Sequence, residues 1–118
     1  MTTIQDYTNT SEFYRIPSPK GEQEVADLQA AINEGERIFA DTFGVLPSTE
    51  NVEAVKFFVF AYWLQWQRLR KTSAGAGAKL RFTQAENEYD QLRRITAYKR
   101  ACIMMGRSDL QLLKIFNY

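Results

Sequence analysis

The sequence predicts an all-α protein: one three-helix bundle-like domain over residues 1–118, with a short fourth C-terminal helix and an extended N-terminal arm over residues 1–17. Two observations predict this class. Apolar residues recur at spacings of three and four on either side of the middle of the chain, as they do on one face of a helix. Between these segments, residues 52–69 are apolar on every side, which is typical of a helix surrounded by other elements.

The bulk composition is that of an ordinary globular protein, with 45% hydrophobic, 14% aromatic and 25% charged residues. Cys102 is the only cysteine, so no disulfide can form within the chain, and a reducing compartment is compatible with this. Residues 1–18 lack the basic, apolar and small-residue pattern of a signal peptide. We therefore expect a soluble intracellular protein.

The central helix is predicted over residues 52–69. A membrane span needs about 20 apolar residues, and Lys56 and Arg68 bracket this stretch too closely. Burial of one large apolar side chain stabilises a fold by roughly 1.5–3 kcal/mol. A buried strand over residues 55–66 is the alternative because β-formers are frequent there, but the length and the charged flanks favour a helix. The predicted core residues are Phe57, Phe58, Phe60, Trp63 and Trp66.

The first helix is predicted to begin at Ser18 and Pro19, which suit a helix N-cap and first turn. Gly35 lies within its apolar stripe and would allow close approach of a neighbouring helix. Gly44 is predicted as its C-terminal cap. Ser48 or Thr49 is predicted to cap the central helix. The apolar stripe consists of Val25, Leu28, Ile32, Phe39 and Phe43.

The third helix is predicted to begin near residue 84, where Thr83 and Glu86 have the spacing of a capping box, and to end at Gly106. Arg93, Arg94, Lys99 and Arg100 lie off its apolar stripe. That stripe consists of Ala85, Tyr89, Leu92, Ile95, Tyr98, Cys102 and Met105. Ser108 and Gln111 repeat the capping-box spacing and predict the short fourth helix, which carries Leu112, Leu113, Ile115 and Phe116.

The N-terminal arm has neither a helical nor a strand period. Phe13, Tyr14 and Ile16 are its apolar residues, so we expect the arm to lie against the body of the domain or against a partner. Its first residues are expected to be disordered.

No catalytic arrangement is apparent in the sequence. There is no histidine, the commonest general base and metal ligand. Cys102 falls on an apolar stripe and is interpreted as a core residue. Acidic residues two apart, such as Glu34 and Glu36, point to different sides of a helix. We expect neither an enzyme nor a cofactor or metal site.

A flexible Gly/Ala-rich loop is predicted over residues 72–81, inside a run of basic residues without an acid. It does not match a phosphate-binding loop, because Ala78 precedes Lys79 and Leu80 follows it. The bases could contact nucleic-acid phosphates without sequence specificity, or they could be a solvated loop that complements a helix end. They are Arg68, Arg70, Lys71, Lys79 and Arg81.

The net charge of +1 conceals a division between the two halves of the chain. Residues 1–55 hold ten acidic and three basic side chains, whereas residues 56–118 hold twelve basic and four acidic ones. The halves could neutralise each other within one molecule. Alternatively, they could present opposite charges on separate faces that meet on neighbouring copies.

Four segments follow an order found in a known family. Residues 13–16 read Phe-Tyr-Arg-Ile before the first helix, and residues 25–44 form an Ala-containing apolar helix that ends in Thr-Phe-Gly. Residues 54–70 carry Tyr62 and Trp63 midway and arginines at the end, and residues 112–116 read Leu-Leu-Lys-Ile-Phe. In this order they resemble the small helical head–tail connector (adaptor) proteins of tailed bacteriophages.

This resemblance implies a virion structural protein assembled in the host cytoplasm, in which about twelve copies form a ring below the portal and receive the tail or its stopper. It implies no membrane association. The basic run at Arg68, Arg70, Lys71, Lys79 and Arg81 would face DNA in the channel or contact the portal. The expected contacts between subunits are Glu22, Glu24, Asp27, Glu34, Arg93, Arg94, Leu112 and Phe116. A small helical nucleic-acid-binding module and an unrelated protein-interaction module are the alternatives.

Overall fold

The computed structural model describes residues 2–74 and 88–107, and throughout these ranges the regular structure is helical. The elements are α1 (Ile4–Thr8), the 3-10 helix η1 (Glu12–Tyr14), α2 (Gly21–Phe43), α3 (Val52–Ala74) and α4 (Glu88–Met104). The predicted all-α class is confirmed, and the strand alternative for residues 55–66 is wrong because they lie within α3. The predicted capping box at residues 83–86, the fourth helix and its residues Leu112 and Phe116 lie outside the described residues.

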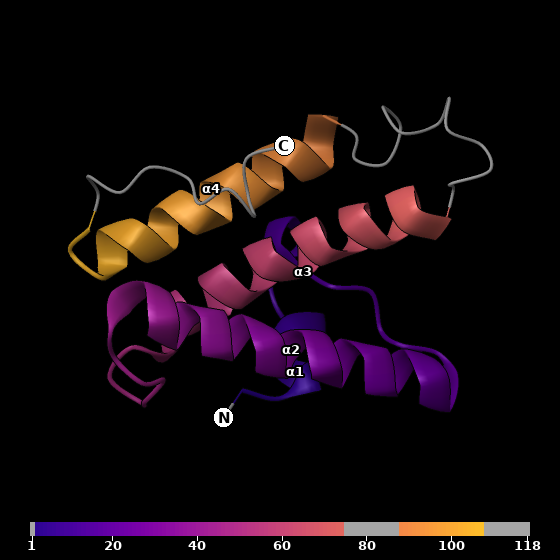
Figure 1. The fold of residues 1–118 in the computed structure, drawn as a ribbon, viewed down its shortest axis with the longest axis horizontal. Coiled ribbons are helices and arrows are strands. Elements are labelled where there is room, and N and C mark those ends of the chain that lie inside the picture. Colours follow the sequence, from indigo (N-terminus) through magenta and orange to yellow (C-terminus); the bar gives the residue numbers. More distant parts are fainter. Residues whose placement is uncertain (1, 75–87, 108–118) are drawn as a thin grey trace.

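The core forms around α3, which packs against α2 on one side and against α4 on the other (Figure 1). Of the predicted core residues, Phe58 and Phe60 are fully buried, whereas Phe57, Trp63 and Trp66 are partly buried at the edge of the core. No described helix is both long and apolar enough to cross a membrane. Among residues 52–67 of α3, the side chains with at most 2% exposure are those of Ala54, Val55, Phe58, Val59, Phe60, Ala61 and Gln65.

The α2 helix has the predicted close approach and the predicted C-terminal cap. A Cβ atom built on Gly35 would lie 3.2 Å from Val59 Cγ2, a tighter contact than is usual, so glycine favours the close approach of the two helices here. Gly44 has a φ of +72°, and its N–H donates to the Ala40 carbonyl, which closes the helix with a left-handed residue.

The predicted starts of the first two helices were displaced. α2 begins at Gly21 rather than at Ser18 and Pro19, with Lys20 N–H donating to Glu24 Oε1 at 3.2 Å. α3 begins at Val52, and Asn51 occupies its N-terminus in place of Ser48 or Thr49. The Asn51 carbonyl accepts the Val55 N–H, and the Asn51 side chain accepts the Ser48 N–H at 2.7 Å. Asn51 therefore stabilises both the first turn of α3 and the turn that precedes it.

The predicted stripe of α4 was wrong in its first half. The side chains that face the core are Arg94, Ala97, Tyr98, Ala101 and Cys102, which follow a strict helical spacing. Tyr89 and Leu92, placed on the stripe by their apolar character, are exposed, and Arg94, predicted to be off the stripe, is 1% exposed. The end of the helix was predicted correctly: Gly106 has a φ of +72°, and Arg107 N–H donates to the Cys102 carbonyl at 2.7 Å.

The N-terminal arm packs against the body of the domain, one of the two outcomes expected for it, and it contains the helical turns α1 and η1. Tyr7 and Ile16 are 1% exposed and belong to the core. The Ile16 N–H donates to the Tyr7 carbonyl at 2.9 Å, which folds the arm back on itself. The helical turns were not predicted because segments of five and three residues are too short for a helical period to show. The predicted loop over residues 72–81 starts later than expected. α3 extends to Ala74, so residues 72–74 belong to this helix rather than to the predicted loop.

Candidate interaction surfaces

The arm is anchored at its beginning by a small polar network on α2. Thr2 N–H donates to Glu36 Oε2 at 2.8 Å, and the Thr2 hydroxyl donates to the same oxygen at 2.5 Å. The Thr2 hydroxyl also lies 2.7 Å from the Tyr7 hydroxyl in a buried position. Burial raises the pKa of the Tyr7 hydroxyl above its ordinary value of 10. This network is structural, and it fixes the first turn of the arm to the middle of α2.

The arm is fastened at its other end by two arginines of α4. The Arg93 guanidinium lies 5.0 Å from the centroid of the Phe60 ring, and Arg93 Nη2 donates to the Arg15 carbonyl at 3.1 Å. The Arg100 guanidinium lies 5.0 Å from the centroid of the Phe57 ring and 5.9 Å from that of Tyr14. Cation–π contacts of this kind stabilise by about 0.5–2 kcal/mol each.

Two of the arginines expected to contact a neighbouring subunit are therefore used within the chain. The Arg93 side chain is only 12% exposed and holds the arm. Arg94 lies in the core at 1% exposure, so its prediction as a surface contact is wrong. The sequence pattern missed this because an arginine can occupy a core position of a helix when its stem is packed and its head group is bonded.

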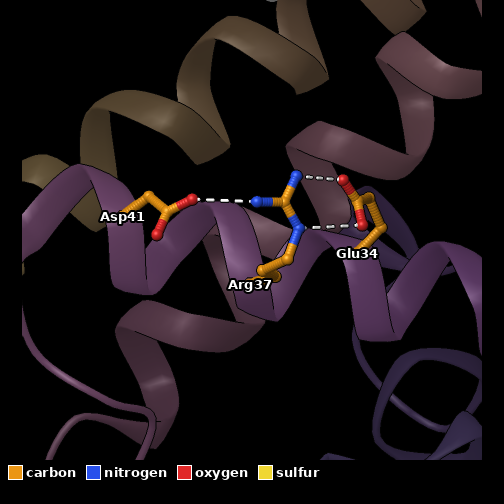
Figure 2. Close-up of polar contacts among 3 residues, drawn as sticks. All are labelled: Glu34, Arg37 and Asp41. Atoms are coloured by element: carbon orange, nitrogen blue, oxygen red, sulfur yellow. Dashed lines mark hydrogen bonds and ion pairs between the residues drawn. The ribbon is translucent and has the colours of Figure 1, made fainter.

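The exposed side of α2 carries a three-residue ion-pair cluster (Figure 2). Arg37 Nε donates to Glu34 Oε2 at 3.1 Å, Arg37 Nη2 contacts Glu34 Oε1, and Arg37 Nη1 donates to Asp41 Oδ2 at 2.9 Å. The hydrogen bond from Arg37 lowers the pKa of the Glu34 carboxyl, and the same bond raises the pKa of Arg37. Glu34, predicted as a subunit contact, is thus already paired within its own helix.

A small cavity of about 80 Å³ lies where the first half of α2, the middle of α3 and residues 16–19 meet. Its walls include the side chains of Glu24 and Asp27 from α2 and of Trp63 and Trp66 from α3. Sequence reasoning assigned the acids to subunit contacts and the tryptophans to the core. It had no signal that the two groups share one cavity, because they lie about forty residues apart in the chain.

The outer face of α4 exposes large apolar side chains. Leu92, Ile103 and Met104 are 56%, 63% and 50% exposed, and Lys99 is exposed between them. Positions 92, 99 and 103 are seven and four residues apart, so these side chains follow one line along the helix. Of the other predicted contacts, Glu22 and Glu24 are exposed and Asp27 is half-buried.

The predicted basic run is placed only in part. Arg68, Arg70 and Lys71 belong to the C-terminal half of α3, whereas Lys79 and Arg81 lie outside the described residues. Within residues 2–74 and 88–107, no group of three or more histidine, cysteine, aspartate or glutamate side chains is arranged to hold a metal ion. Cys102 is buried in the core, where it was predicted to lie.

Gln65 is a core residue that the sequence did not single out. It is fully buried on α3, and in the described part of the chain neither its Nε2 nor its Oε1 atom has a hydrogen-bond partner. Its burial was not predicted, because Gln65 follows an unbroken apolar run and could equally mark the exposed end of that run.

The chain matches no family model, no curated protein and no solved structure in the three comparisons made. The function must therefore be argued from the surfaces described above.

Proposed function

We propose that the protein is a non-enzymatic assembly subunit of the head–tail connector (adaptor) type, which forms an oligomeric ring between the portal and the tail of a phage particle. The observation that carries this proposal is a separation of charge across the domain. α2 holds six acidic side chains and one basic one, whereas the exposed bases of α4 are Lys99 and Arg100, because Arg93 holds the arm and Arg94 lies in the core. The two helices pack on different sides of α3 (Figure 1).

This arrangement supports pairing between copies through unlike surfaces. The ion pairs of Arg37 and Arg93 are local, each joining residues three or four positions apart on one helix. The exposed acids of α2 in one copy can meet the exposed Lys99 and Arg100 of the next. A contact between unlike surfaces, repeated with the same rotation, forms a ring when the rotation closes. Complementary charge also favours this pairing over contacts between like surfaces.

The exposed apolar side chains of α4 support the proposal independently. Leu92 and Ile103 lie on one line of α4 with Lys99 between them, and a partner that packed along this line would cover both side chains. Of the residues that carry the resemblance to the connector family, Tyr62 and Trp63 lie midway along α3, and Gly44 ends α2.

The proposal is tested by analytical ultracentrifugation over a wide protein concentration range at low and high salt. A salt-sensitive step from monomer to a large closed oligomer is expected, and negative-stain electron microscopy should then show rings. A monomer under every condition would contradict self-assembly through charge, leaving only assembly on a partner ring that has already formed.

A contact with the DNA channel or the portal is proposed for the basic run that begins at Arg68, Arg70 and Lys71. Replacing these three residues by glutamate should impair retention of packaged DNA or attachment to the portal while leaving the helical content unchanged. Particles that assemble and keep their DNA with this triple variant would count against that role.

A nucleic-acid-binding module is the second candidate, because the sequence carries the basic run from Arg68 to Arg81, and Lys99 and Arg100 are exposed on α4. Fluorescence anisotropy with a labelled duplex distinguishes it. Affinity of the isolated protein that falls steeply with salt would favour this candidate, whereas absence of binding at low salt would exclude it.

A further inference from the structure

The three most exposed large apolar side chains of residues 2–74 and 88–107 lie on two different surfaces. Leu46 is 78% exposed in the connector between α2 and α3, whereas Ile103 and Leu92 are 63% and 56% exposed on the outer face of α4. Because α2 and α4 pack on different sides of α3 (Figure 1), one molecule does not bring these surfaces together. Both surfaces are therefore available to other molecules.

Leu46 forms one wall of a shallow groove at the C-terminal half of α2, which we call the α2 groove. It has a volume of about 440 Å³, and its apolar lining consists of Ala40, Leu46 and Pro47. Its polar rim includes Arg37 and Asp41. Covering the apolar lining of this groove removes apolar surface from water, which favours binding of an apolar side chain.

The connector holds Leu46 in its exposed position. Gly44 N–H donates to the Ala40 carbonyl at 2.8 Å, and Asn51 Nδ2 donates to the Leu46 carbonyl at 3.1 Å. The Asn51 side chain also accepts the Ser48 N–H at 2.7 Å. Hydrogen bonds therefore fix the connector on both sides of Leu46, so a partner meets this side chain in place and little ordering entropy is lost on binding.

The charge of α2 favours a basic partner, although the acids of the groove are already paired. Asp41 Oδ2 accepts a hydrogen bond from Arg37 (Figure 2), and Glu36 Oε2 accepts from Thr2. A contact here therefore does not rest on a free carboxylate. However, α2 holds six acidic side chains and one basic one, so the summed field of the helix stays negative.

The outer face of α4 has the composition and the length of a helix that fits this groove. Leu92, Lys99 and Ile103, which we call the α4 line, occupy positions i, i+7 and i+11, and apolar anchors at such spacings are typical of a helix that binds in a groove. The α4 line is about 16 Å long, and the groove extends about 12 Å along α2 between residues 33 and 41. The two lengths agree to within one helical turn.

Pairing of these unlike surfaces is more favourable than pairing of like surfaces. If two copies met through α4, the exposed Lys99 and Arg100 of each would approach the same cations of the other. If two copies met through α2, their acids would approach one another. The α4 line in the α2 groove instead brings opposite charges together, and it covers Leu46, Leu92 and Ile103 in one contact.

We propose that the α4 line of one copy of the chain docks into the α2 groove of a second copy, with Leu92 and Ile103 packed against Leu46 and the other apolar residues of the groove. This inference rests on the proposed self-assembly and specifies its contact. The contact joins unlike surfaces, so each copy can bind one neighbour through its groove and another through its line. Repetition of the contact gives a ring when the rotation between copies closes.

Serine variants test the apolar part of the contact. Leu46→Ser and Ile103→Ser should each weaken self-association about tenfold in sedimentation velocity at low salt, because each removes a side chain that the partner covers. Val45→Ser and Met104→Ser are the matched controls, since these neighbours are 43% and 50% exposed but belong neither to the groove nor to the line. Controls that weaken association as much as the test variants would overturn the inference.

A mixing experiment tests whether the two surfaces belong to one contact. Leu46→Asp should disable only the groove and Ile103→Asp only the line, because each places a charge against apolar side chains. Each variant alone should therefore be monomeric. An equimolar mixture retains one intact groove and one intact line, so it should form a 1:1 dimer and nothing larger. A mixture that stays monomeric, or that forms larger oligomers, would overturn the inference.

The outcomes separate this contact from the proposed function, with far-UV circular dichroism as the check that each variant is folded. If both aspartate variants still form rings, the contact is wrong and ring formation stands. If the wild-type chain forms open chains rather than rings and the variants block them, the contact holds and the closed ring is wrong. If the wild-type chain stays monomeric at every concentration, the contact is overturned together with autonomous ring formation.

Discussion

Replacing Gly35 by alanine should destabilise the protein, although alanine is the better helix former. Built on Gly35, a Cβ atom would lie 3.2 Å from Val59 Cγ2, 3.3 Å from Tyr62 Cδ2 and 3.4 Å from Val59 Cα. Favourable carbon–carbon contacts begin at about 3.5 Å. The two tighter contacts are to the side chains of Val59 and Tyr62, which pack between the helices and would have to shift by a few tenths of an ångström.

The change in the free energy of unfolding caused by Gly35→Ala is the difference between two opposing effects. Alanine gains about 1 kcal/mol over glycine in a helix interior, and overpacking a tight interface costs about 1–3 kcal/mol. We therefore expect Gly35→Ala to lower the free energy of unfolding by about 1 kcal/mol, measured by urea unfolding with an unchanged dependence on denaturant. Ala30→Gly, at an exposed position of α2, calibrates the propensity effect in the same helix and should cost about 1 kcal/mol.

A double-mutant cycle with Val59→Ala isolates the contact. Val59→Ala alone should cost about 2 kcal/mol for the lost buried methyl groups. In that background Gly35→Ala should be neutral or stabilising, because Cγ2 is gone, and the coupling should be about 1 kcal/mol. The close-approach argument is refuted if Gly35→Ala stabilises the wild-type protein and the Val59→Ala variant equally.

Three further predictions follow from the described contacts. Gly44→Ala should cost about 1 kcal/mol in urea unfolding, because φ is +72° and nothing lies within 4 Å of the added Cβ, so the whole cost is backbone strain; an unchanged stability would contradict this. Arg94→Ala should lower the free energy of unfolding by about 2–4 kcal/mol, because Arg94 is buried. Lys99→Ala should lower it by at most about 0.5 kcal/mol in monomeric protein, because Lys99 is exposed. Equal effects of the two substitutions would refute the assigned burial. Burial raises the pKa of Tyr7, so the folded state retains the hydroxyl proton that the unfolded state releases above pH 10. The contribution of the protonated Tyr7 hydroxyl to stability is therefore present below pH 10 and is lost as the pH rises further. Tyr7→Phe should therefore lose less stability than the wild type between about pH 9 and pH 11, and parallel losses in the two proteins would show that Tyr7 is not responsible.

Much of the fold could be predicted because several signals in this sequence are local. Gly44 and Gly106 end their helices by adopting a positive φ, which glycine does at little cost, and both were identified from position alone. Gly35 was identified because it interrupts an apolar stripe where another helix must pass. The length and charged flanks of the aromatic run favoured a helix over the alternative strand, and α3 confirms the helix.

The rest depends on contacts between distant residues, which no local pattern encodes. Tyr7 and Ile16 enter the core because the arm folds onto helices that follow it in the chain. Arg94 was assigned to the surface by its charge, although its place in the helical spacing with Ala97 and Ala101 put it in the core. The small cavity beside residues 16–19 combines predicted acids with tryptophans expected in the core, and only the crossing of α2 and α3 brings them together.

The fastening of the arm has a consequence for the order of folding. Neighbouring helices in the chain make the α2–α3 and α3–α4 contacts, so the body can form from local pairs and should form quickly. The bond between Arg93 and Arg15 spans 78 residues and requires α4 to be in place. The part of the arm around Arg15 therefore docks only after α4, and until then the Phe57 and Phe60 rings lack their contact with Tyr14. Deleting the arm should slow folding little, while increasing the tendency of the chain to aggregate.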